Sequence, residues 1–175
     1  ITVSPPLQMN LLGALLIAVS EWTNSTSLLL SLESHGREDI FDGVDISRTV
    51  GWFTSIFPVW LERPDGDVGV ILQSVHAQLE RLAHRGFGFG LLRYLAGDEG
   101  VQQQLEALPR PEISFDYLGQ FDQLLERSQW FEWEEQSAGP TRSPRSHRRD
   151  VLEVIGAVGN GQLRFTWTFG TQLHE

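Results

Sequence analysis

The feature that most constrains the fold is a pair of strand-like segments late in the chain. Residues 151–158 (VLEVIGAV) and 162–170 (QLRFTWTFG) flank the short segment GNG. Apolar, β-branched and aromatic residues on both sides of an Asn-Gly pair are a strong signal for a β-hairpin. The sequence therefore predicts two antiparallel strands of a sheet in this region.

Helical and strand-like patterns alternate before this hairpin. Helices are predicted from Ser4 or Asn10 to about Trp22, and over residues 68–84, 91–97 and 100–108. Strands are predicted over residues 27–33, 49–62 and 113–121, with an edge strand at 129–135. Turns at 35–48 and 85–90 separate these elements, and the Arg-rich segment 137–149 is predicted to be a flexible loop.

This order of elements favours a single domain over residues 1–175. A chain of this length can bury a core of its own. Because strands and helices are mixed along the chain, the expected fold is an α/β (α+β) two-layer sandwich with a mixed sheet.

Composition excludes several classes of function. The formal net charge of −10 disfavours nucleic acid as a partner, because phosphate groups attract cations. The chain has no cysteine and no lysine, which excludes disulfides, cysteine nucleophiles, Schiff-base chemistry and a P-loop. Its five histidines have no metal-ligand spacing, so no metal site is expected.

No segment predicts a membrane protein. The longest apolar run, residues 11–19, has about half the length that a spanning helix needs. A signal peptide would require Arg or Lys near its start, but none precedes Arg37, so a cytoplasmic protein is expected. The chain opens without Met and stops soon after a strand, and we expect it to be part of something longer.

A candidate site lies where an apolar strand meets the ionisable segment ESHGRE, residues 33–38. Glu33 stands at the C-terminal end of a predicted interior strand, where ligand crevices form in α/β sheets. Partial burial there would raise the pKa of its carboxyl group and suit it to proton transfer. The alternative is a carboxylate paired with Arg37 or Arg48, and residue types alone favour this alternative.

The other candidates are weaker. His35 is either a proton carrier or an ordinary turn residue, and Ser34 lacks the G-x-S-x-G context of a hydrolase nucleophile. Tyr117, in FDYLGQF, is either a core aromatic or a hydroxyl donor. The segment RGFGFG does not follow a strand, so we interpret it as a turn with packed Phe side chains rather than a phosphate-binding loop.

Four motifs together resemble the epimerization domain of nonribosomal peptide synthetases, in the condensation-domain superfamily. ESHGRE is similar to the family's E-G-H-G-R-E, and FDYLGQF to its F-N-Y-L-G-(Q/R). RTVGWFTSIFP, which contains Arg48 and Trp52, resembles R-T-V-G-W-F-T-x-x-(Y/F)-P without a gap, and AHRGFGFG resembles a Gly-rich segment of the family. The motifs keep the family's order over residues 33–121, which makes the resemblance highly specific.

The resemblance implies a fold like that of chloramphenicol acetyltransferase, with two similar lobes and an active site in the channel between them. This chain resembles the C-terminal lobe only. The family's H-H-x-x-x-D-G motif belongs to the N-terminal lobe, and no His-His pair occurs here. The N-terminal lobe is therefore expected on another chain or elsewhere in a longer protein.

The family reaction inverts the α-carbon of an aminoacyl or peptidyl thioester on the 4′-phosphopantetheine arm of a peptidyl carrier domain. No cofactor of its own is implied. An α-proton is removed and one is returned to the opposite face, through an enolate that needs a hydrogen-bond donor. By resemblance, Glu33 is the acid/base opposite the missing histidine, Tyr117 is the supporting donor, and Ser34, His35 and Asp116 line the substrate channel.

Two positions depart from the family motifs. Ser34 replaces a glycine and adds a side chain beside the acid/base. Asp116 replaces an asparagine, and a second carboxylate near Glu33 would raise one pKa and disfavour an enolate. Three functions are therefore considered: an epimerase lobe, which the motifs favour, a condensation lobe that forms peptide bonds, and a non-catalytic lobe that docks a carrier domain.

Overall fold

The computed structural model describes residues 5–38, 40, 42–122, 130, 139, 143 and 145–171. Five strands form one sheet in the order β2-β1-β3-β4-β5. The strands are β1 (Ser27–Ser34), β2 (Ser55–Glu62), β3 (Ile113–Gln120), β4 (Leu152–Gly159) and β5 (Gln162–Phe169). The helices are α1 (Pro5–Thr23), α2 (Val68–Glu80), α3 (Gly88–Leu95) and α4 (Glu99–Glu106), with the 3₁₀ turn η1 (Ala83–Gly86).

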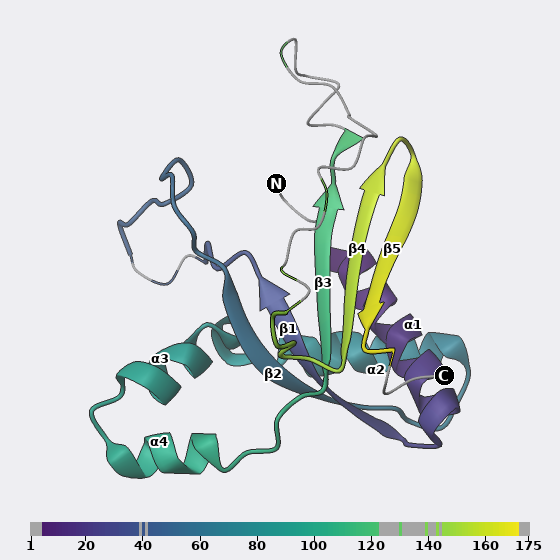
Figure 1. Cartoon of the computed structure of the whole chain (residues 1–175), viewed down its shortest axis with the longest axis horizontal. Helices are drawn as coiled ribbons and strands as arrows, with labels where there is room; N and C mark the ends of the chain where they lie inside the picture. The colour runs from purple at the N-terminus through teal and green to yellow at the C-terminus, as the bar shows by residue number, and fades with distance from the viewer. Residues whose placement is uncertain are drawn as a thin grey trace.

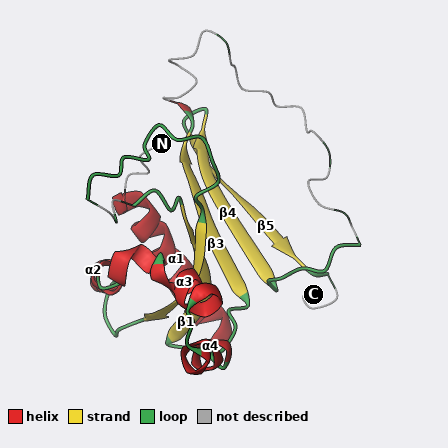
Figure 2. Cartoon of the chain, turned by 90° about the vertical axis from the view of Figure 1, so that its left-hand side faces the viewer, coloured by secondary structure: helices red, strands yellow, loops and turns green. Residues whose placement is uncertain are grey.

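The sheet is mixed, as the sequence predicts. Strand β1 runs antiparallel to β2 and parallel to β3, β3 runs parallel to β4, and β4 and β5 are antiparallel. Helices α1 and α2 contact each other and cover one face of the sheet, whereas α3 and α4 lie beyond the edge strand β2 (Figures 1 and 2). The predicted α/β fold is therefore confirmed.

Alternate residues of the strands build the core. Side chains along a strand point to opposite faces in turn, so every second residue faces α1 and α2. The buried residues on this face are Leu28, Leu30, Leu32, Phe57, Val59, Leu61, Phe115, Tyr117, Leu152 and Val154. They pack with residues of the helices, among them Leu12, Leu16, Ile71 and Val75, in one hydrophobic cluster. The intervening residues of β1, β3 and β4 face away from the helices.

Helix α2 shows how local sequence sets an element. Ile71, Val75 and Leu79 recur every four residues and are its buried side. The helix begins after Asp67, whose carboxylate accepts a hydrogen bond from the backbone N–H of Val70 at 3.0 Å. Such N-caps satisfy one of the free N–H groups of the first turn.

Several predicted boundaries are wrong. The second strand begins at Ser55 rather than residue 49, and α2 ends at Glu80 rather than residue 84. A left-handed turn at His84, Arg85 and Gly86, with φ of 46°, 50° and 79°, separates α2 from α3, which begins at Gly88 rather than residue 91. Helix α1 begins at Pro5, so Asn10 lies inside it.

Two predicted segments include residues that the structure does not describe. Of the predicted edge strand at 129–135 only residue 130 is described, and of the predicted loop at 137–149 only residues 139, 143 and 145–149 are described. Within the described part of the chain, no helix is long and apolar enough to cross a membrane.

The predicted hairpin is confirmed, and Asp122 supports its turn. Asn160 and Gly161 form the two-residue connection with φ of 53° and 67°, the left-handed backbone that such turns require. The carboxylate of Asp122 accepts hydrogen bonds from the backbone N–H groups of Asn160 (2.5 Å) and Gly161 (2.9 Å).

Replacing Asp122 with Ala is expected to lower the free energy of unfolding by about 1–2 kcal/mol, because two hydrogen bonds to a charged acceptor are lost. Urea denaturation would measure the change. Asp65→Ala is the matched control, since it removes an exposed carboxylate from another turn. Equal effects of the two substitutions would contradict a structural role for the Asp122 contacts.

Candidate active site

Glu33 lies on the interior strand β1, next to its last residue. It stands opposite Ile56 of β2 on one side. On the other side Leu32 pairs with Phe115 of the parallel strand β3, so the following residues, Glu33 and Asp116, are neighbours. Both are half-buried. Because Leu32 and Phe115 point to the helices, Glu33 and Asp116 project from the opposite face.

A third carboxyl group, Glu153 of β4, shares this face. Asp116 pairs with Ile155, and Ser114, two residues earlier on β3, pairs with Glu153. We call the side of the sheet that carries Glu33, Asp116 and Glu153 the carboxylate face. Sequence reasoning missed Glu153: the alternation of Leu152 and Val154 around it shows which way it points, but not that β4 lies beside β3.

The pKa values of Glu33 and Asp116 are raised in this arrangement. Burial raises the pKa of Glu33, and the negative charge of Glu153 raises it further. The pKa of Asp116 is raised to about 6 by burial and by the charges of Glu33 and Glu153. A carboxylate paired with arginine would have a lowered pKa, so these shifts argue against the predicted alternative of an ion pair with Arg37 or Arg48.

Arg37 instead organises the loop that follows β1. Its guanidinium donates hydrogen bonds to the backbone carbonyls of Ile46 (2.7 Å), Thr49 (2.9 Å) and Gly51 (3.4 Å). It also lies over the ring of Phe53, 4.4 Å from the centroid. Arg37 therefore draws residues 46–53 back to the end of β1.

The remaining charged residues of ESHGRE brace neighbouring turns. The carboxylate of Glu38 lies 3.6 Å from Arg85 and 3.7 Å from His35. His35 is exposed, and its Nδ1 accepts a hydrogen bond from the backbone N–H of Arg37 at 2.9 Å. The Glu38–Arg85 contact ties the motif to the left-handed turn before α3.

The other predicted site residues are dispersed. Ser34 ends β1 opposite Ser55 and, by the alternation of the strand, belongs to the side of the sheet that faces the helices. Arg48 and Trp52 lie in the loop after β1, where Trp52 is 88% exposed.

Tyr117 is buried on the helix side of β3, together with Phe115. Its hydroxyl has no hydrogen-bond partner among the described residues, and burial raises its pKa. The structure thus brings Glu33 and Asp116 together and places Tyr117 on the other face. The donor role of Tyr117 stays a prediction.

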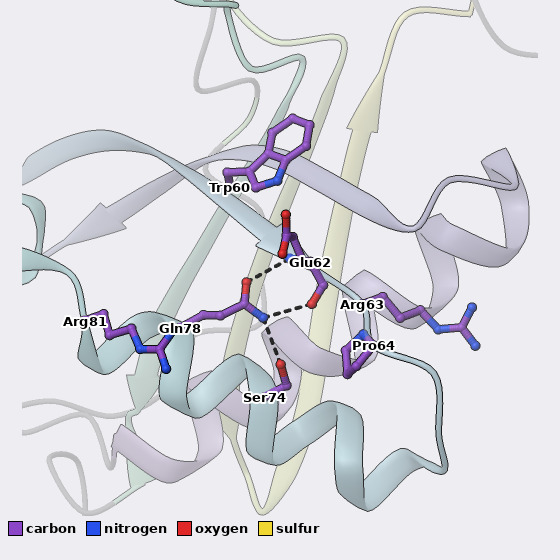
Figure 3. Close-up of a pocket in the computed structure, with 7 residues that line it drawn as sticks. All are labelled: Trp60, Glu62, Arg63, Pro64, Ser74, Gln78 and Arg81. Atoms are coloured by element: carbon purple, nitrogen blue, oxygen red, sulfur yellow. Dashed lines mark hydrogen bonds between the residues drawn. The ribbon is translucent and has the colours of Figure 1, made fainter.

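A cavity of about 470 Å³ lies at the end of β2 far from Glu33, between that strand and α2 (Figure 3). Gln78 crosses it: its Oε1 accepts from the backbone N–H of Glu62 (2.8 Å), and its Nε2 donates to the carbonyl of Glu62 (2.8 Å) and to Ser74 (3.1 Å). These bonds join α2 to β2, a structural role. Within the described ranges, no three acidic or histidine side chains are placed to hold a metal ion.

Comparison with known proteins identifies relatives of this chain. A model of the condensation domain family matches residues 5–175. A linear gramicidin synthase protein of Brevibacillus parabrevis is 42% identical over 172 residues, which are 97% of this chain and 2% of that protein. Bacitracin synthase 2 of Bacillus licheniformis is 39% identical over 160 residues, 91% of this chain and 6% of that protein.

Solved structures of two synthetase domains also resemble this chain. The epimerization domain from the third module of tyrocidine synthetase B matches with a TM-score of 0.81 and 34% identity, covering 93% of this chain and 36% of that chain. The first condensation domain of the calcium-dependent antibiotic synthetase matches with a TM-score of 0.57 and 14% identity, over 94% of this chain and 33% of that chain. At 14% identity, the match to this condensation domain shows a shared fold and nothing more. This chain spans about a third of either structure and a few per cent of the synthases.

Proposed function

The chain belongs to the condensation domain family of nonribosomal peptide synthetases, and on this basis we propose that it is the C-terminal lobe of an epimerization domain. The proposed reaction converts an L-aminoacyl or peptidyl thioester, held on the 4′-phosphopantetheine arm of a peptidyl carrier domain, to the D form. The observation that carries the proposal is Glu33, a half-buried carboxyl group with a raised pKa at the end of an interior strand. The 34% identity with a solved epimerization domain supports it.

Glu33 would act as one of two acid/base groups on opposite sides of the α-carbon. One group removes the α-proton, the electrons pass into the thioester carbonyl to form an enolate, and the other group returns a proton to the opposite face. The partner group is the histidine expected on an N-terminal lobe. A raised pKa suits Glu33 to this cycle, because it brings the protonated and ionised forms closer in energy near neutral pH.

Two other functions have specific support. The family description fits a condensation lobe that forms peptide bonds. Asp116 fits a non-catalytic lobe that docks a carrier domain, because a negative charge beside Glu33 would disfavour an enolate.

One assay separates the three functions. The complete two-lobe protein would be mixed in D₂O with a carrier domain loaded with an L-aminoacyl group, and α-deuterium incorporation and the D/L ratio would be followed. Incorporation with growth of the D form supports the epimerase. Peptide-bond formation with an acceptor-loaded carrier but no incorporation would favour the condensation function, and carrier binding without either reaction would favour docking.

Asp116→Asn is expected to speed α-deuterium incorporation by roughly 3–10-fold at pH 8, because it removes a negative charge beside the enolate. The pKa of Asp116 is about 6, so at pH 5 the wild-type group is mostly protonated and the two proteins should converge. Asp65→Asn, a change on an exposed turn, is the control. A slower Asp116→Asn protein at pH 8 would show that the Asp116 carboxylate assists the reaction.

A further inference from the structure

We propose that Glu153 is a positioning residue of this site: from β4 it sets how readily Glu33 and Asp116 release a proton. The inference rests on the proposed function and concerns a residue outside all four sequence motifs. It follows from the strand order, the spacing of three carboxyl groups and the other charges on the same face.

The register places Glu153 close to both groups. Strands β1, β3 and β4 are parallel neighbours, and Ser31, Ser114 and Glu153 form one row across them. Glu33 and Asp116 form the next row that projects from the same face. Asp116 is thus the diagonal neighbour of Glu153, and diagonal neighbours in a sheet lie roughly 7–8 Å apart, within reach of long side chains.

The row of Ser31, Ser114 and Glu153 has small side chains beside Glu153. Ser31 is buried, and the hydroxyl of Ser114 is buried without a hydrogen-bond partner among the described residues. No bulky side chain of the row therefore separates Glu153 from Glu33. A charge–charge interaction across such a partly buried surface is screened less than one in open water.

The edge strands β2 and β5 present mostly uncharged side chains to this region. Strand β2 presents Ile56 and Pro58 beside Glu33 and Ser31. Strand β5 presents Thr168 opposite Glu153 and Thr166 opposite Ile155, and Arg164 stands opposite Ala157, further along the strand. The guanidinium of Arg164 lies 3.4 Å from the side chain of Gln162. The charges that move the pKa of Glu33 and Asp116 are carboxylates.

The negative charge of Glu153 acts on the two other carboxyl groups of this face. Each negative charge makes the next ionisation harder, so Glu153 raises the pH at which Glu33 and Asp116 lose a proton. Removing its charge should therefore move that pH downward. The pH–rate profile should shift to lower pH whether Glu33 first acts as base or as acid. In either case one limb of the profile follows the pKa of Glu33.

The test uses the complete two-lobe protein and a carrier domain loaded with an L-aminoacyl group. Glu153→Gln keeps the size of the side chain and removes its charge. The pH profile of α-deuterium incorporation is expected to shift to lower pH, and Glu153→Asp should restore a profile close to the wild type. Glu106→Gln, which removes an exposed carboxylate of α4, is the matched control and should leave the profile unchanged.

A second measurement does not depend on turnover. Carbon-13 NMR of the side-chain carboxyl groups, in the same protein, would follow the titration of Glu33 and Asp116 directly. Lower midpoints in Glu153→Gln support the inference even if no variant incorporates deuterium, a result that would overturn only the proposed function. Unchanged midpoints in a folded Glu153→Gln protein would overturn the role of Glu153 whatever the activity.

Discussion

Replacing Glu33 with Gln is expected to slow α-deuterium incorporation by a factor of about 10²–10⁴, the usual contribution of a general acid/base. Gln has nearly the same shape as Glu but cannot take up or release a proton near neutral pH. The neighbours of Glu33 across the sheet, Ile56 and Asp116, keep their positions, so the loss would come from chemistry rather than from packing. The assay with the carrier-loaded two-lobe protein measures this loss.

Glu62→Gln is the matched control for this experiment. Glu62 lies on the same side of the sheet as Ile56, but at the far end of β2, and it is exposed. The Glu62→Gln protein should incorporate α-deuterium at a rate within about twofold of the wild type, as for most surface substitutions. Thermal unfolding of both variants would show that each is folded. A Glu33→Gln protein with the wild-type rate would remove Glu33 from the mechanism.

Replacing Gly36 with Ala is expected to lower the free energy of unfolding by about 3 kcal/mol or more, whereas Gly43→Ala should cost about 1–2 kcal/mol. Both glycines have the left-handed backbone, with φ of 65° and 79°. A Cβ at Gly36 would overlap the backbone carbonyl of Phe53, but a Cβ at Gly43 would meet nothing within 4 Å. The difference between the variants therefore measures the overlap alone.

Urea denaturation of the two proteins, under identical conditions, gives this difference. The overlap at Gly36 would also push residue 53 away from β1, where Arg37 holds the loop through Phe53 and the carbonyls of residues 46–51. Hydrogen exchange should therefore increase in residues 46–53 of Gly36→Ala and not of Gly43→Ala. Equal stability losses would mean that the loop moves aside freely and is not fixed by the close contact.

Local patterns predicted the hairpin and the position of α2 but not where β2 begins. Residues 49–54 have the β-branched and aromatic side chains of a strand, and the sequence extends the strand to them. In the structure the side chain of Arg37 binds the carbonyls of Thr49 and Gly51, which an extended strand would offer to its neighbour. A side chain twelve or more residues away thus decides the boundary, and no local propensity contains that information.

The candidate site was likewise predictable from the sequence only in part. The sequence motifs identified Glu33 and Asp116, and their raised pKa values agree with the expectation of a partly buried pair. Alternation along a strand puts the adjacent residues Asp116 and Tyr117 on opposite faces, but the sequence does not show which of these faces the helices cover. Glu153 could not be found from the sequence, because its closeness to Asp116 depends on the parallel pairing of β3 with β4.

The alternation of side chains along β1 and β3 has a consequence for how such a lobe can evolve. Leu32 and Phe115 are anchored in the core, while Glu33 and Asp116, the very next residues, lie on the other side of the same backbone. Substitutions at these two carboxylates alter charge and proton affinity without disturbing the packing beneath them. The fold and the charge of this face can therefore be selected almost separately, and an aspartate such as Asp116 can occupy the position of a neutral residue of the same size without loss of the fold.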